Sequence, residues 1–152
     1  MRFVIDAIPS AELARLRAQG HDDFGNPWIA RTYDEGGFPL RCCLREAEAG
    51  EALALMAYQP FAWDGPYAEV GPVFVHADAC PGYLDPDAYP EAYRHRQQIF
   101  RAYGFDHSII DAEIVDGIDA EPTITKLLSR PDVDFVHSRN VNYGCYMFAI
   151  SR

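Results

Sequence analysis

The sequence contains almost no lysine. Of its 13 basic residues twelve are arginines and one is Lys126, and 23 Asp and Glu oppose them, so the formal net charge is −10. Proteins that bind nucleic acid or an anionic membrane surface gain much of their affinity from basic residues that meet phosphate groups. The acidic balance argues against both partners, and we expect no nucleic acid and no membrane.

A long hydrophobic run is also missing. The longest uncharged apolar stretch, Ala52 to Trp63, is interrupted by Gln59 and Pro60, whereas a membrane-spanning helix needs about 20 apolar residues. Only three apolar residues separate Arg2 from Asp6, far fewer than a secretory signal peptide uses. We therefore expect a cytoplasmic protein whose four cysteines are free thiols in a reducing compartment.

Several signature motifs are absent. The chain has no G-x-G-x-x-G, P-loop, G-x-S-x-G or kinase signature, which excludes the commonest nucleotide-binding and hydrolase families. It also has no C-x-x-C or H-E-x-x-H pair. Zinc would have to use His76-x-x-x-Cys80, completed by Cys145 or His137. We expect instead that His76 is a hydrogen-bonded core residue and that the protein holds no metal and no cofactor.

The sequence does contain short alternating segments, typical of an antiparallel sheet. The spacing predicts a helix over Ser10–Gln19, with Ser10 as N-cap and Gly20 ending it, and a second helix with Pro122 in its first turn. Residues 53–58 fit either a strand or a short helix. Strands are expected at residues 3–8, 28–33, 38–45, 70–77, 97–103, 108–115, 133–139 and 145–150.

The chain length suits a single domain over residues 1–152. Because most consecutive strands are expected to form hairpins, the predicted fold class is α+β: a largely antiparallel β-sheet of about seven or eight short strands with two helices packed on it. Residues 80–90, with three prolines, are expected to form a long loop.

One predicted strand carries chemistry on its polar face. If residues 38–45 alternate regularly, Arg41, Cys43 and Arg45 lie on one side, and Cys42 lies on the apolar side. Two guanidinium groups beside a thiol would favour its thiolate form. The ordinary alternative is a solvated strand face on which Cys43 has no role.

A further arginine stands near the C-terminus, where Arg139 and Asn140 follow a predicted strand. Arginine suits bidentate binding of carboxylate or phosphate. Our leading hypothesis is a pocket for a small anionic ligand, gripped by Arg41, Arg45 and Arg139, with Glu69 and Asn140 as further ligand-binding candidates. Ordinary ion pairs with the many acidic residues are the competing explanation.

Two other functions remain open. The first is a thiol enzyme or redox protein in which Cys43 is the nucleophile and His76 or His137 its base; Glu69, before an apolar strand, is a candidate general base or an ion-pair partner. The second is an interaction module or homo-oligomer that uses exposed aromatic residues and hairpin strands as its contact surface.

Three sequence blocks carry a family resemblance. RCCLR (residues 41–45), PYAEVGPVFVHADAC (residues 66–80) and HSRNVNYGCYMFAISR (residues 137–152) together resemble the bacterial family DUF1203. The resemblance extends from about Gly25 to the end of the chain. It implies a single bacterial domain of this length, and it implies no catalytic residue because the family has no established activity.

Overall fold

The computed structural model describes residues 1–152 and contains two antiparallel sheets. Five strands form the larger sheet in the order β1-β7-β6-β4-β5, and every neighbouring pair is antiparallel. The α+β class with a largely antiparallel sheet is confirmed. The strand bounds are β1 Val4–Asp6, β4 Gln97–Gly104, β5 Ile109–Asp116, β6 Val133–Arg139 and β7 Tyr146–Ser151.

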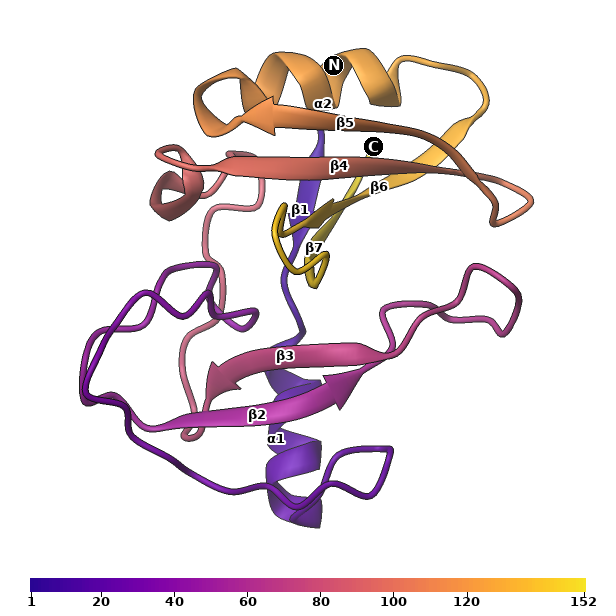
Figure 1. The fold of residues 1–152 in the computed structure, drawn as a ribbon. Coiled ribbons are helices and arrows are strands. Elements are labelled where there is room, and N and C mark those ends of the chain that lie inside the picture. Colours follow the sequence, from indigo (N-terminus) through magenta and orange to yellow (C-terminus); the bar gives the residue numbers. More distant parts are fainter.

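The smaller sheet is a two-stranded ribbon, β2 (Leu53–Tyr58) and β3 (Gly71–His76). Helix α2 (Ala120–Leu128) covers one face of the five-stranded sheet, and the ribbon lies on the opposite side, with α1 (Ser10–Gln19) against it (Figure 1). The molecule is therefore layered, and the two helices occupy its opposite ends. Neither helix is long and apolar enough to cross a membrane.

The hydrophobic interior consists of two clusters. One has 17 buried residues and joins α2 to the five-stranded sheet through side chains such as Ile124, Leu128 and Phe148. The other has 13 and joins α1 to the ribbon through Leu13 and Val75, among others. Each helix buries a single apolar stripe, so each needs its own sheet to cover it.

Most predicted elements are present at or near their expected positions. Helix α1 has the predicted bounds, and Gly20 ends it in the left-handed conformation at φ 82°. The predicted N-cap is wrong by one residue, because Pro9 occupies that position and no side chain caps the helix. The 53–58 segment is a strand, since it pairs along its whole length with β3.

The predicted hairpin of residues 28–33 and 38–45 is wrong. Neither segment is a strand, and residues 40–45 form a compact turn. Within this turn the Leu44 N–H donates to the Leu40 carbonyl at 3.1 Å, and the Leu40 N–H donates to the Arg45 carbonyl at 2.9 Å. Leu44 has φ 55°, a left-handed conformation that is not found in a regular strand. The alternation of apolar and polar residues in the sequence does not indicate it. Arg41, Cys43 and Arg45 consequently do not share a strand face.

Candidate metal centre

Four potential metal ligands meet where β3 ends. Cys42 and Cys43 come from the 40–45 turn, His76 is the last residue of β3, and Cys80 lies in the loop that follows. One ligand atom of each residue lies within 4.8 Å of the ligand atoms of all the others. Sequence segments more than 30 residues apart therefore supply a single Cys3His cluster.

Backbone contacts hold the turn against the ribbon. Leu40 forms a parallel bridge with Phe74 of β3, and the Arg41 N–H donates to the Phe74 carbonyl at 2.9 Å. The His76 N–H in turn approaches Cys42 Sγ at 3.3 Å. These contacts hold Cys42 and Cys43 beside the imidazole of His76.

Three of the four ligand atoms are spaced as in a tetrahedral site. His76 Nδ1 lies 3.5 Å from Cys42 Sγ and 3.8 Å from Cys43 Sγ, and the two sulfur atoms are 3.9 Å apart. For bonds of about 2.3 Å to sulfur and about 2.0 Å to nitrogen, tetrahedral zinc places two sulfurs about 3.8 Å apart and a sulfur and a nitrogen about 3.5 Å apart. The three ligand atoms already stand at nearly the required separations.

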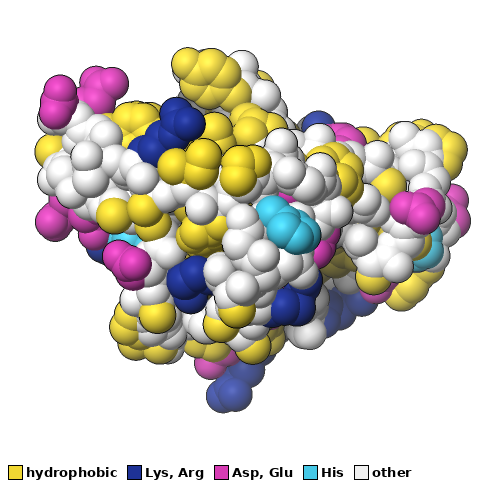
Figure 2. Space-filling model, turned by 90° about the horizontal axis from the view of Figure 1, so that it is seen from below, with side chains coloured by type: hydrophobic (Ala, Val, Ile, Leu, Met, Phe, Trp, Pro, Cys, Tyr) yellow, Lys and Arg dark blue, Asp and Glu magenta, His cyan; other side chains and the backbone are white.

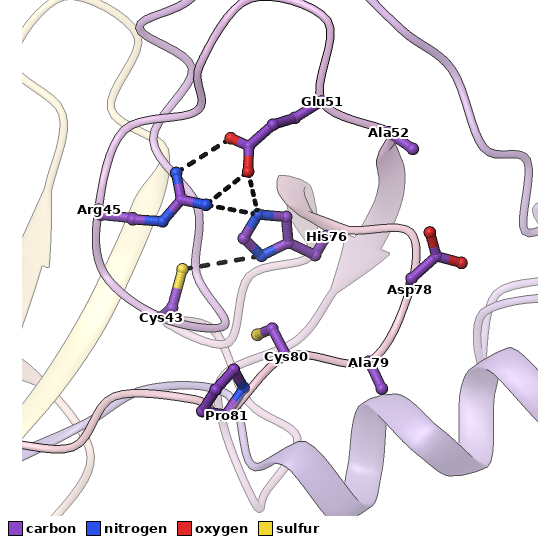
Figure 3. Close-up of a pocket in the computed structure, with 9 residues that line it drawn as sticks. All are labelled: Cys43, Arg45, Glu51, Ala52, His76, Asp78, Ala79, Cys80 and Pro81. Carbon is purple, nitrogen blue, oxygen red and sulfur yellow. Dashed lines mark hydrogen bonds and ion pairs between the residues drawn. The ribbon is translucent and has the colours of Figure 1, made fainter.

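The opposite side of the imidazole is held by a charged pair. His76 Nε2 lies 3.1 Å from Glu51 Oε1, and Arg45 donates both terminal amines to the same carboxylate at 3.0 and 2.5 Å (Figure 3). The Arg45 guanidinium lowers the pKa of Glu51 to about 2, so this carboxylate is ionised at neutral pH. Arg45 Nη2 also lies 3.0 Å from His76 Nε2, so this nitrogen faces both a donor and an acceptor. A metal bound at Nδ1 would require the proton on Nε2, where Glu51 is the acceptor.

The two adjacent thiols differ in acidity. A hydrogen bond from the Cys42 thiol lowers the pKa of Cys43 to about 6, assisted by the backbone N–H and the guanidinium charge of Arg45. The pKa of Cys42 is raised, because its proton is engaged by Cys43 and because the side chain is buried. Because cysteine binds metals as the thiolate, a cation bound at this cluster would displace the thiol proton of Cys42 as well as that of Cys80.

Two cavities border the cluster. The first, of about 360 Å³, is lined by Cys43, Arg45 and Glu51 among others, and the second, of about 320 Å³, is lined by Cys42 and by residues of α1. His76 and Cys80 line both. Figure 3 shows the first cavity, with Cys43 and Cys80 on the same side of the imidazole ring. The cluster therefore forms the wall between the two.

The three arginines expected to grip one ligand do not line a common cavity. Arg41 is 2% exposed, and its Nε and Nη1 donate to the carbonyls of Tyr146 and Pro39 at 2.7 and 2.5 Å. Arg45 lines the cavity beside His76, whereas Arg139 lies at the end of β6. Arg45 is the only one of the three that lines the first cavity, and Arg139 lines a separate hollow.

Two other predicted site residues pair with arginines: Glu69 from the loop between β2 and β3, and Asn140 directly after β6. Glu69 accepts from Arg139 at 2.8 Å, and Asn140 accepts from Arg96 at 2.6 Å. Of the two histidines considered as a base for Cys43, only His76 contacts it. His137 is 1% exposed and is surrounded by aromatic rings.

Comparison with known families identifies the family to which the chain belongs. A family model described as "Protein of unknown function (DUF1203)" matches residues 37–152. The chain belongs to the DUF1203 family. The matched region contains all four residues of the Cys3His cluster. Comparison with curated proteins and with solved structures returned no match.

Sequence reasoning for this DUF1203 protein considered His76 and Cys80 as ligands but did not find the complete cluster. Cys42 and Cys43 were expected on opposite faces of a strand, where they could not share a metal, and this expectation is wrong because residues 40–45 form a turn. Glu51 was not singled out at all. The usable signal was the combination of adjacent cysteines with the H-x-x-x-C spacing, since a turn can direct two adjacent thiols to one point.

Proposed function

We propose that this DUF1203 protein binds a zinc ion through Cys42, Cys43, His76 and Cys80. The observation that carries the proposal is the approach of three thiols and one imidazole nitrogen to within 4.8 Å of one another. Thiolate and imidazole ligands in a tetrahedral set favour zinc over hard cations such as magnesium or calcium. A reducing cytoplasm would keep these thiols available for the metal.

The role we infer for the ion is structural. All four positions of a tetrahedral site are taken by protein side chains, as in closed zinc sites, whereas catalytic sites leave one position for water or substrate. The ion would join the 40–45 turn to the end of β3 and to the loop at Cys80. Glu51 would act as the outer partner of His76, orienting the imidazole through Nε2.

Metal analysis of the purified protein tests this proposal. We expect a single zinc ion per chain by elemental analysis, and after exchange to cobalt we expect the thiolate-to-metal charge-transfer absorption of a sulfur-rich site. Cys80→Ser and His76→Ala should lose most of the metal. Cys145→Ser is the matched control and should retain it, because Cys145 is a free cysteine outside the cluster.

The proposal fails if protein refolded with excess zinc and then desalted holds none. It also fails if Cys145→Ser loses as much metal as Cys80→Ser, because the binding would then not depend on the four clustered residues. Circular dichroism of each variant establishes that the chain is folded before its metal content is compared.

A second candidate function uses the same residues without a metal. Cys43, His76 and Glu51 are arranged as nucleophile, base and orienting carboxylate, with 3.8 Å from Sγ to Nδ1 and 3.1 Å from Nε2 to Oε1. The two functions exclude each other, since zinc would occupy both Sγ and Nδ1. If zinc is bound, it should protect Cys43 from iodoacetamide; a metal-free chain whose Cys43 is alkylated much faster than Cys145 would favour the thiol enzyme.

A further inference from the structure

A second polar cluster lies on the larger sheet, on the face turned away from α2. Arg101 of β4 and His137 of β6 are directly paired across the strands, and Arg139 follows two residues later on the same face. The His137 ring packs against Phe61, whose loop connects β2 to β3, with ring centroids 5.0 Å apart. This places three nitrogen-bearing side chains beneath the 59–70 loop.

The cluster has an excess of positive charge. Glu69 is the one carboxylate in contact with the two arginines, accepting from Arg101 at 2.6 Å and from Arg139 at 2.8 Å. Two guanidinium groups against one carboxylate leave a net charge of +1 in a protein whose total is −10. Burial and the two adjacent arginines hold the pKa of His137 well below its ordinary value, so the histidine itself stays neutral.

Arg139 is built into the fold but is incompletely bonded. Its side chain is only 4% exposed, and although Nη1 donates to Glu69 and to the Gly144 carbonyl, Nε and Nη2 have no partner. A buried guanidinium with unsatisfied donors costs free energy that a purely structural ion pair does not require. A ligand that supplies the remaining acceptors would account for such a residue.

The same two residues open onto a cavity. Glu69 and Arg139 line a hollow of about 170 Å³, together with the side chains of Tyr58, Tyr143 and Tyr146. Tyr58 and Tyr146 pack with their ring centroids 5.7 Å apart. The hollow offers apolar walls and one charged end, the combination found in sites for small amphipathic ligands.

We propose that Arg101 and Arg139 bind the carboxylate of a small organic acid, and that Glu69 occupies this position when no ligand is present. Glu69 is 44% exposed and lies in a loop, so it can leave the arginines without disrupting a strand. The ligand's carboxylate would take the place of Glu69 and would also accept from the unpartnered Nη2 of Arg139 in a bidentate contact. Its apolar part would lie against the tyrosines. This site shares no residue with the proposed metal centre, so either can fail without the other.

Binding of acetate, benzoate and inorganic phosphate, measured by calorimetry at low ionic strength, tests the proposal. Because Glu69→Gln removes the competing charge and leaves the two arginines, it should bind benzoate about tenfold or more tightly than the wild type does. Adding Arg101→Met to Glu69→Gln should reverse this gain. Arg130→Met added to Glu69→Gln is the matched control, since Arg130 pairs with Asp111 and Asp132 on other segments and loses the same charge.

A chemical-shift change at the Nε–H resonance of Arg139 on benzoate addition would locate the ligand at the buried guanidinium. Tighter binding of phosphate than of benzoate would overturn the assignment to organic acids. Absence of benzoate binding to folded Glu69→Gln, or equal loss of binding with Arg101→Met and Arg130→Met, would overturn the site itself.

Discussion

At the scale of single residues, Asp22 shows how one side chain can organise a loop. Its carboxylate is 1% exposed and accepts the backbone N–H groups of Phe24, Asn26 and Ala57, together with the Asn26 side-chain amide, at 2.8 to 2.9 Å. Burial opposes ionisation, but these four donors outweigh it and lower the pKa of Asp22. The loop before Trp28 and the strand β2 are thereby joined through a single ionised group.

We predict that Asp22→Ala lowers the free energy of unfolding by about 3 kcal/mol, because buried donors lose their acceptor. The pH dependence has a definite sign: a depressed folded pKa contributes stability above the unfolded value of about 3.9, and this stability is lost as the pH falls through the folded pKa. Denaturation by urea at neutral and acidic pH should therefore show the difference between wild type and Asp22→Ala shrinking in acid. Asp23→Ala, which breaks only an exposed pair with Arg15, should cost less than about 1 kcal/mol; an equal cost would contradict this account.

At the scale of elements, the predictions were correct wherever hydrophobic spacing and a terminating residue agreed. Helix α1, the β4–β5 hairpin and helix α2 follow from periodic apolar residues bounded by glycine or proline. The 38–45 segment alternates just as clearly, yet it forms a turn because Leu40 and Leu44 are buried on different sides: Leu44 packs in the α2 cluster and Leu40 in the α1 cluster. An alternating pattern predicts which side chains are buried. In this segment the buried side chains enter two different hydrophobic clusters instead of one face of a sheet.

The incorrect strand prediction for residues 38–45 is the reason that the sequence did not predict the four-residue cluster. His76 and Cys80 follow from spacing, but the direction of Cys42 and Cys43 depends on the left-handed conformation of Leu44 and on backbone bonds to β3. Glu51 is far from His76 in the sequence, so its contact is set by tertiary structure alone. Local patterns therefore supply the kinds of ligand, and the packing of distant segments decides which of them meet.

The short connection between β5 and α2 provides a prediction at the same scale. Gly117 begins this connection, and a Cβ placed there would lie 2.7 Å from Arg94 Cα and closer still to the Tyr93 carbonyl oxygen. We expect Gly117→Ala to lower the free energy of unfolding by roughly 1–3 kcal/mol, the usual cost of overpacking. Gly71→Ala is the matched control, because its Cβ would meet no atom within 4 Å. Thermal denaturation of both variants decides, and equal melting temperatures would contradict the predicted contact.

At the scale of the whole molecule, exposed hydrophobic side chains are dispersed. The most exposed, Leu84, Ile118 and Tyr143, come from three separate segments of the chain, and the face in Figure 2 shows apolar groups interrupted by charged side chains. A stable oligomer normally needs a continuous apolar area. The dispersal gives the interaction-module hypothesis less support than either proposed site.

The layered core leads to a last prediction about metal removal. His76 ends β3, and the other three ligands of the proposed centre come from the turn and the loop that flank the ribbon. The 13-residue cluster that contains Leu40 and Cys42 also contains Leu13 and Leu16 of α1. If zinc joins these segments, a chelator should lower amide protection in β2, β3 and α1 more than in β4 and β6, whose pairing involves none of the ligands. Hydrogen exchange with and without chelator measures this difference residue by residue. Cys80→Ser should already show the reduced protection and should not respond to chelator, and a uniform loss over both sheets would contradict a centre that stabilises one layer.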